Sequence, residues 1–240
     1  MVMQPKRVEL VKVEGIGTSY FGKITKKRLD VSKLGPAAFV SPDFKDALLK
    51  LQQLVKSAGG NLWITDLTRD WKTQDKAHTE YLVGKKPFVA KPGGSFHGAG
   101  RAVDLDIQNL NFPTPKQDWL KKLWELALPL GFRPVIDKPE MNKSEAWHYD
   151  FVGVWKNALE KLSYSEAAKC ATLDVGMWNP EKDKDVVYKM FIQAQLIRLG
   201  HYEIGAVDGL IGRKTITTLQ TYDIRDFTDL ESVASGLCYQ

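Results

Sequence analysis

The sequence predicts an α+β fold in which helices flank a small antiparallel sheet, followed by a small all-α domain. Three observations predict it. The segments RAVDLDI and AWHYDFV alternate apolar and polar residues, as half-buried strands do. Apolar residues recur at helical spacing in the stretch that follows Ser41. From Lys184 onward, two helical patterns are joined by the glycine-rich turn GAVDGLIG.

The stretch SPDFKDALLKLQQLVKSAGG has a signal at each end of a helix. Ser41 can cap the helix and Pro42 suits its first turn, while Gly59 or Gly60 can end it. The apolar residues at helical spacing are Phe44, Leu48, Leu51 and Val55. We expect this face to be buried in a core.

A short strand, NLWIT, follows this helix, and then comes the loop DLTRD. The loop leads into a second predicted helix, from about Trp71 to Leu82. The next segment, KKPFVAKPGG, has two prolines and two glycines and is predicted to be a loop. A further helix is expected from about Pro115 to Leu128. Its predicted buried residues are Trp119, Leu120, Leu123 and Trp124.

Each of the two alternating segments has an apolar and a polar face. In the first strand Val103, Leu105 and Ile107 share one face, and Ala102, Asp104 and Asp106 share the other. In the second strand His148 and Asp150 lie opposite Trp147, Tyr149 and Phe151. The two polar faces therefore carry most of the candidate functional groups.

The pattern divides the chain into three parts. Residues 1–161 form the predicted α+β domain, and 162–183, with DVGMWNPEKDKD, are predicted to be a linker. Residues 184–240 form a small helical domain, with one helix that ends at Leu199-Gly200 and another that starts near Arg213. A length of 240 residues is enough for one good-sized core and a small second domain.

The net charge of +5 is unevenly spread. From Lys184 onward there are six Lys/Arg against seven Asp/Glu, so the basic excess lies before it. Such an excess favours approach to a polyanion, namely nucleic acid, an acidic membrane or a bacterial cell wall, although it can also serve solubility alone. We find no RNA- or DNA-binding motif with the required aromatic spacing and expect no nucleic-acid partner.

The amino-terminal stretch MVMQPKRVELVKVEG has no apolar run long enough for a signal peptide, and no later stretch could span a membrane. We therefore expect synthesis in the cytoplasm, no membrane partner, and release by some other means if the protein acts outside. Cys170 and Cys238 are too few for a disulfide scaffold, and they are either paired with each other or free.

His97 lies in a glycine-rich turn seven residues before Asp104, which opens onto the polar face of a strand. Gly98 and Gly100 permit a tight turn that would let both side chains face one point. His148, on the polar face of the other strand, supplies a third candidate ligand. Catalytic zinc commonly takes three such protein ligands and leaves one position for water.

Glu145, three residues before His148, would lie beside the metal without binding it. There it could accept a proton from a water molecule as a general base. Arg69 precedes a helix and could stabilise an oxyanion, or it could simply pair with Asp66 or Asp70. Asp106 is either a rival ligand or, as we favour, a group that supports the ligands.

The segments SFHGAGRAVD and EAWH resemble the family of zinc peptidases that includes D-alanyl-D-alanine carboxypeptidases and dipeptidases and phage L-alanyl-D-glutamate endopeptidases. The family motif is Ser-x-His-x-x-Gly-x-Ala-x-Asp followed by Glu-x-x-His. Its positions are filled here by Ser95, His97, Gly100, Ala102, Asp104, Glu145 and His148. The upstream arginine and glutamine of the family are matched by Arg69 and Gln74. The aromatic residue that usually precedes this arginine is absent, since the chain has LTR there.

The resemblance covers roughly residues 42–151. It implies that His97, Asp104 and His148 bind zinc, with Glu145 and Arg69 as catalytic residues. It further implies that Ser95 and Gln74 contact the substrate, a peptide bond of the peptidoglycan stem. The departure before Arg69 bears on the substrate contacts and leaves the ligand set intact.

The segments IQAQLIRLGHY and GAVDGLIGRKTITTLQTY resemble the small helical peptidoglycan-binding domain. The matching residues are Gln193, Leu196, Leu199, Gly200, Asp208, Gly209, Gly212, Thr215, Leu219 and Gln220. The alternative is a helical pair that only stabilises the enzyme. Tying a catalytic domain to a wall-binding one would raise its effective concentration at an insoluble substrate.

These resemblances predict an endolysin of the phage type, a zinc endopeptidase that cuts the L-Ala-D-Glu bond and reaches the wall after release from the cytoplasm. We expect it to be a monomer. The alternatives with the same chemistry are a D-alanyl-D-alanine carboxypeptidase and an injected cell-wall toxin. A non-catalytic wall-binding or virion structural protein is the alternative of another class. The complete set of ligands together with Glu145 argues against it.

Overall fold

The computed structural model describes residues 4–20, 28–86 and 88–238. The chain divides into two compact units. The sheet unit comprises Leu10–Arg69 and Gly100–Gly153. The helical unit comprises Met1–Glu9, Asp70–Ala99 and Val154–Gln240. Both units are therefore assembled from segments that are separated in the sequence.

The sheet unit holds a six-stranded sheet in the order β3-β2-β5-β6-β8-β7. The strands are β2 (Gly17–Thr18), β3 (Leu29–Asp30), β5 (Trp63–Asp66), β6 (Ala102–Leu105), β7 (Phe132–Pro134) and β8 (His148–Phe151). A separate two-stranded sheet pairs β1 (Val11–Lys12) with β4 (Phe39–Val40).

The sheet is mixed, which corrects the prediction of an antiparallel sheet. β2 and β5 are parallel, and the other neighbours in the six-stranded sheet are antiparallel. Parallel neighbours need a long crossover connection. Here the chain between β2 and β5 passes through β3, the 3-10 segment η1 (Val31–Ala38), β4 and the helix α2 (Pro42–Ser57). Strands of two residues, such as β2, are too short to give a sequence pattern that would reveal this pairing.

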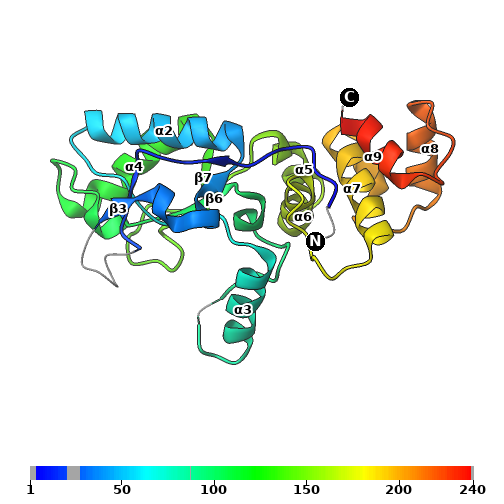
Figure 1. Cartoon of the computed structure of the whole chain (residues 1–240). Coiled ribbons are helices and arrows are strands. Elements are labelled where there is room, and N and C mark those ends of the chain that lie inside the picture. The colour runs from blue at the N-terminus through cyan, green and yellow to red at the C-terminus, as the bar shows by residue number, and fades with distance from the viewer. Residues whose placement is uncertain (1–3, 21–27, 87, 239–240) are drawn as a thin grey trace. The chain divides into compact units, whose positions relative to one another are not determined.

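The core of the sheet unit lies between the sheet and the helices α2 and α4 (Trp119–Ala127). The four predicted core residues of α2 are all fully buried: Phe44, Leu48, Leu51 and Val55. The predicted apolar face of β6 also belongs to this core, through Val103, Leu105 and Ile107. Figure 1 shows α2 running along the sheet. The predicted α+β character of this region is confirmed.

The ends of α2 agree with the prediction in position and differ at the cap. Pro42 is its first residue, and Ser41 precedes it without a capping hydrogen bond. The Ser41 hydroxyl instead accepts a hydrogen bond of 2.9 Å from Arg101 Nη1. At the other end Gly59 has a φ of 77°, and the Gly60 N–H donates to the Val55 carbonyl at 2.9 Å. A left-handed glycine thus ends the helix.

The other predicted helices of this region are present. α3 (Trp71–Leu82) has the predicted bounds, and Asp70 caps it by accepting from the Thr73 N–H. The predicted helix near residues 115–128 consists of η4 (Lys116–Asp118), α4 and η5 (Leu128–Leu130). Within it Leu120 and Leu123 are buried, whereas Trp119 and Trp124 are only partly buried. The Trp124 N–H donates to the Tyr149 hydroxyl, so this indole keeps a polar partner.

In its described residues, the helical unit contains α3 and five later helices, of which α6, α7 and α9 pack side by side (Figure 1). The later helices are α5 (Lys156–Lys161), α6 (Tyr164–Asp174), α7 (Lys184–Arg198), α8 (Arg213–Thr221) and α9 (Leu230–Cys238). The remaining 3-10 segments of the chain are η2 (Phe96–Ala99), η3 (Ile107–Asn109), η6 (Gly153–Trp155) and η7 (Tyr202–Ile204). The end of α7 and the start of α8 agree with the predicted helical pair.

The helix α6 lies inside the stretch that was predicted to be a linker, so the prediction of a loose connection is wrong for Tyr164–Asp174. Its small residues Ala167, Ala168, Cys170 and Ala171 are all fully buried. A helix whose buried residues are mostly small carries a weak hydrophobic pattern, which explains why the sequence did not reveal it. α6 packs against both α7 and η2.

Two further observations concern the cysteines and the length of the helices. Cys170 and Cys238 are both free thiols in the structure. Within the described part of the chain, no helix combines the length and the apolar character that crossing a membrane requires.

Candidate metal centre

The pairing of β6 with β8 places two of the predicted ligands side by side. The strands are antiparallel, with Asp104 opposite His148 and Ala102 opposite Asp150. Directly opposite residues in such a pair point to the same face of the sheet, with Cβ atoms about 4.5–5.5 Å apart. Their neighbours Val103 and Tyr149 point into the core. The alternation of each strand therefore becomes one shared polar face.

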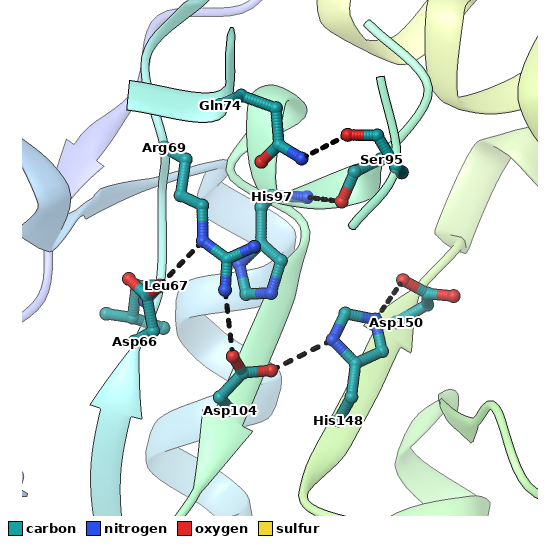
Figure 2. A network of polar contacts seen from close by, with 10 residues as sticks. Asp66, Leu67, Arg69, Gln74, Ser95, His97, Asp104, His148 and Asp150 are labelled. Atoms are coloured by element: carbon teal, nitrogen blue, oxygen red, sulfur yellow. Dashed lines mark hydrogen bonds and ion pairs between the residues drawn. The ribbon is translucent and has the colours of Figure 1, made fainter. Parts of the chain in front are cut away.

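His148 is held between two carboxylates, as Figure 2 shows. Its Nδ1 lies 2.9 Å from Asp104 Oδ1, and its Nε2 lies 3.0 Å from Asp150 Oδ1. Burial alone would lower the pKa of His148, but the hydrogen bonds and charges of Asp104 and Asp150 outweigh it and raise that pKa to about 10. The surroundings of this imidazole thus favour positive charge.

Asp150 fixes the orientation of His148. It is fully buried and bonds Nε2, so Nδ1 is the nitrogen turned toward Asp104. A carboxylate on the far nitrogen of a histidine ligand is a common arrangement in metal sites, because it sets the tautomer and the ring orientation. The sequence placed Asp150 on the correct face and proposed Asp106 for this supporting role.

Asp106 is engaged elsewhere. Both of its carboxylate oxygens accept from Asn109 Nδ2 at 2.9 Å, at the start of the η3 turn. It is not a member of the group of potential metal ligands. The difference arises because the regular strand β6 ends at Leu105, so alternation no longer fixes the direction of the next side chain.

His97 lies on η2, and this segment packs so closely against α6 that little room is left for a side chain at Gly98. A Cβ atom at Gly98 would lie 3.2 Å from the Thr172 hydroxyl of α6. Phe96 makes an edge contact with Tyr164, also of α6, at 5.5 Å between ring centroids. The helix that the sequence concealed therefore supports the segment that carries His97.

Both the backbone conformation of Gly100 and its close neighbours favour glycine at this position. Its φ is 61°, a left-handed conformation that favours glycine. A Cβ atom there would lie 3.1 Å from Val40 Cα and 3.2 Å from the Thr68 hydroxyl. This is the turn that the sequence predicted between the first two ligands.

His97, Asp104 and His148 form the one group of potential metal ligands found among the residues that the structure describes. One ligand atom from each lies within 4.8 Å of the others, and all three residues are buried. Two imidazoles and a carboxylate are suited to a divalent transition metal. The structure thus brings together the three residues that the sequence singled out.

Arg69 bonds the carboxylate of Asp104, one of the three potential metal ligands. Its Nε donates to Asp66 Oδ2 at 2.7 Å, and its Nη2 donates to Asp104 Oδ2 at 3.0 Å (Figure 2). Burial opposes the charge, but Asp66, Asp104 and Glu145 together raise the pKa of Arg69. Asp104 therefore faces Arg69 with one oxygen and His148 with the other.

Glu145 lies in the turn before β8, half-buried, with a φ of 65°. Its carbonyl accepts from the His148 N–H at 2.9 Å, and its charge acts on Arg69. A glutamate in the left-handed region is uncommon and costs about 1–2 kcal/mol. Backbone strain of this kind concentrates at functional sites, where the surrounding structure over-determines it.

The two predicted substrate-binding residues belong to the segment that carries His97. Gln74, on α3, donates from Nε2 to the Ala90 carbonyl at 2.6 Å. Its Oε1 is buried and has no hydrogen-bond partner among the residues that the structure describes. Ser95 Oγ accepts from the His97 N–H at 3.3 Å.

Arg101 is an important residue that sequence reasoning did not find. It is buried, and its guanidinium donates to Ser41, to the Phe151 carbonyl and to both carboxylate oxygens of Asp43. It thereby ties the start of α2 to the ends of β6 and β8, which carry Asp104 and His148. A charged residue directly before a buried strand is the signal that could have revealed it.

Residues 37–154 match the VanY family of D-alanyl-D-alanine carboxypeptidases. The matched segment contains all three members of the ligand group, as well as Arg69 and Glu145. No curated protein matches the chain. The match supports a hydrolase of the D-alanyl-D-alanine carboxypeptidase type, with a peptidoglycan substrate and a metal requirement.

Proposed function

We propose that the protein is a zinc-dependent endopeptidase of peptidoglycan that cleaves the L-Ala-D-Glu bond of the stem peptide. The observation that carries the proposal is the buried group of His97, Asp104 and His148 within 4.8 Å, in a segment that matches a peptidoglycan peptidase family. Zinc bonds of about 2.0–2.2 Å place the ligand atoms of one ion about 3.4 Å apart, so small side-chain rotations would close this group around zinc.

Three residues would hold the ion: His97, Asp104 through the oxygen that faces His148, and His148 through Nδ1. When bound, zinc polarises the scissile carbonyl and acidifies a water molecule. Asp150 keeps the His148 ring in place by bonding Nε2. Arg69 restrains Asp104 through the second carboxylate oxygen.

Glu145 is the proposed general base. Its side chain is half-buried and its charge acts on Arg69, which in turn donates to Asp104 of the ligand group. It would accept the proton of the attacking water and deliver a proton to the leaving amine. Arg69 would stabilise the negative charge that develops on the scissile carbonyl oxygen. Ser95 and Gln74 would bind the peptide on the side of the His97 turn.

A D-alanyl-D-alanine carboxypeptidase is the second candidate, because the family that matches residues 37–154 carries that description. The two activities use the same groups and differ in where the stem peptide lies. Purified peptidoglycan digested with the zinc-loaded protein and analysed by mass spectrometry separates them. A new free amino group on D-Glu marks the endopeptidase, and loss of one terminal D-Ala marks the carboxypeptidase.

Residues 184–240 are proposed to bind peptidoglycan and to hold the enzyme at the wall, as an endolysin released from the cytoplasm would require. Leu210, in the turn of this segment, is 72% exposed, as suits a contact residue. The test is cosedimentation of a Glu145→Gln chain with intact sacculi. The Leu210→Ser change should lower the bound fraction, whereas Leu128→Ser, at another exposed leucine, should leave it unchanged.

The same proposal gives the expected solution behaviour, which is that of a monomer. Sedimentation of the intact chain at several concentrations would test it. A mass that rises with concentration would contradict a monomer.

A further inference from the structure

A cleft of about 790 Å³ opens in the sheet unit beside the candidate metal centre. Asp104 forms part of its wall, so the cleft borders the ligand group directly. The other wall residues that matter here are Ser19, Arg28, Thr65, Met141 and Trp147. The cleft therefore combines a cation and two hydroxyls with an apolar surface.

The cation, Arg28, is placed by the sheet. Its guanidinium carbon lies 4.2 Å from the centroid of the Trp63 ring. The Trp63 ring in turn covers Gly17 of β2, since a Cβ atom at Gly17 would lie 2.0 Å from the ring. A side chain at this position would displace the indole that supports Arg28.

Stacking leaves the edge of a guanidinium free to donate, because the ring contacts its flat face and the N–H groups lie in its plane. Within the described ranges, no carboxylate lies within ion-pair distance of Arg28. Arg69, by contrast, is bound to two carboxylates. Arg28 is thus the cation of the cleft that is available to a ligand.

The acidic groups of the cleft do not oppose a negative ligand strongly. Asp104 is bonded by Arg69 and His148, and Asp106 accepts both bonds from Asn109. Both carboxylates therefore already have donors. The opposing apolar surface comes from Met141 and Trp147, which are partly buried against the core.

We propose that Arg28 binds a carboxylate of the stem peptide and thereby sets which bond lies at the metal centre. The carboxylate comes from D-Glu or from the terminal D-Ala, and the methyl groups of the alanines lie against Met141 and Trp147. This proposal rests on the proposed function. Arg28 and Ser19 lie outside the segment 37–154 that matches the family.

The test measures binding rather than turnover. The background is the zinc-loaded full chain with Glu145→Gln, and the probes are a synthetic stem pentapeptide and two amides of it. One amide blocks the free carboxylate of D-Glu and the other blocks that of the terminal D-Ala. Isothermal titration calorimetry gives the Kd of each peptide for the background chain and for its Arg28→Gln, Arg28→Lys and Lys50→Gln derivatives.

Arg28→Gln should weaken binding of the free pentapeptide by about 10- to 100-fold, the usual effect of losing a charge-assisted hydrogen bond. Arg28→Lys should recover part of the loss, because it keeps the charge without the planar fork. Lys50→Gln removes the same charge from an exposed position on α2 and should change nothing. The amide that binds equally well to the background and to Arg28→Gln identifies the carboxylate.

Equal Kd values for the background and Arg28→Gln with all three peptides would overturn the proposal, as would a background chain that binds none of them. The proposed function fails separately. If the chain that retains Glu145 cleaved no peptidoglycan while binding still depended on Arg28, the carboxylate site would stand without the hydrolase. If it cleaved peptidoglycan while Arg28 had no effect, the hydrolase would stand without this site.

Discussion

Buried polar side chains gather on the β6–β8 face of the sheet unit and on α7 of the helical unit, and their partners differ. On the sheet, Asp104, His148 and Asp150 bond one another through their side chains. On α7, Gln193 accepts from the N–H groups of Asp208 and Gly209 and donates to the Leu210 carbonyl. The sheet network thus joins side chains to one another. Gln193 of α7 mainly holds a backbone turn, although it also donates to Asp208 Oδ1, and the nearby Gln195 donates to the Asp174 side chain.

The same use of polar groups recurs at α6. Glu166 accepts from the Val207 N–H, and Lys169 donates to the Val207 carbonyl. Side chains that hold backbone groups cannot exchange partners unless the loop opens, since buried backbone groups must remain bonded. Side chains that hold one another can rearrange around a ligand by small rotations. The comparison therefore favours ligand binding at the β6–β8 face and a structural role for the polar contacts of α6 and α7.

The largest expected effect follows from removing a ligand. His148→Ala should abolish both metal binding and peptidoglycan cleavage, because two protein ligands rarely hold zinc firmly. Metal content by atomic spectroscopy and cleavage are measured on one preparation. Asp106→Asn is the matched control, since Asp106 is an acidic neighbour bonded to Asn109, and it should retain the metal. Full zinc occupancy in His148→Ala would reject the ligand set.

Glu145→Gln should lower turnover by about 10²–10⁴-fold, the usual contribution of a positioned base, while zinc stays bound. The amide keeps the shape of the side chain and loses its basicity. Parallel loss of zinc and activity would instead make Glu145 a ligand. Glu145→Gly sharpens the test, because glycine adopts a φ of 65° without strain. That variant should be inactive and unfold at no lower urea concentration than Glu145→Gln.

In the helical unit, Gln193→Ala should lower the free energy of unfolding by about 1–3 kcal/mol, the cost of leaving buried polar groups unbonded. The rate of hydrolysis of a soluble muropeptide at saturating substrate should change by no more than about twofold. Such a change corresponds to less than about 0.5 kcal/mol of activation free energy. Urea denaturation gives the first quantity and initial rates give the second. A large loss of turnover with unchanged stability would contradict the division between the two regions.

The smallest expected effect concerns the pair that joins α2 to the strands. Burial opposes ionisation of Asp43, but Arg101 outweighs it and lowers the pKa of Asp43. Because the folded-state pKa lies below the unfolded value of about 3.9, the stabilisation is present above that pH and is lost as pH falls below it. Asp43→Asn should therefore make stability less dependent on pH between about 4 and 2.

Urea denaturation at several pH values in this range measures the effect. Asp46→Asn, at an exposed position on the same helix, is the control for removing one acidic group from α2. An unchanged pH dependence in Asp43→Asn would mean that the pair with Arg101 contributes nothing to folding.

Much of the site could be predicted from local sequence. Alternation placed Asp104, His148 and Asp150 on polar faces, because side chains in a strand point to opposite sides in turn. The two glycines that follow His97 indicated the turn before Asp104, and Gly100 does adopt a left-handed conformation. The core face of α2 followed from helical spacing in the same way.

Only the tertiary structure decided which residues meet. Strand register depends on hydrogen bonds between distant segments, and it placed Asp104 directly opposite His148. His148 Nε2 bonds Asp150 of its own strand, whereas Asp106 lies beyond the end of β6. The parallel pairing of β2 with β5 has the same origin. The alanine-rich face of α6 carries little hydrophobic signal, and its burial against α7 and η2 became visible only in the fold. Local pattern fixes the direction of a side chain, whereas long-range packing fixes its neighbour.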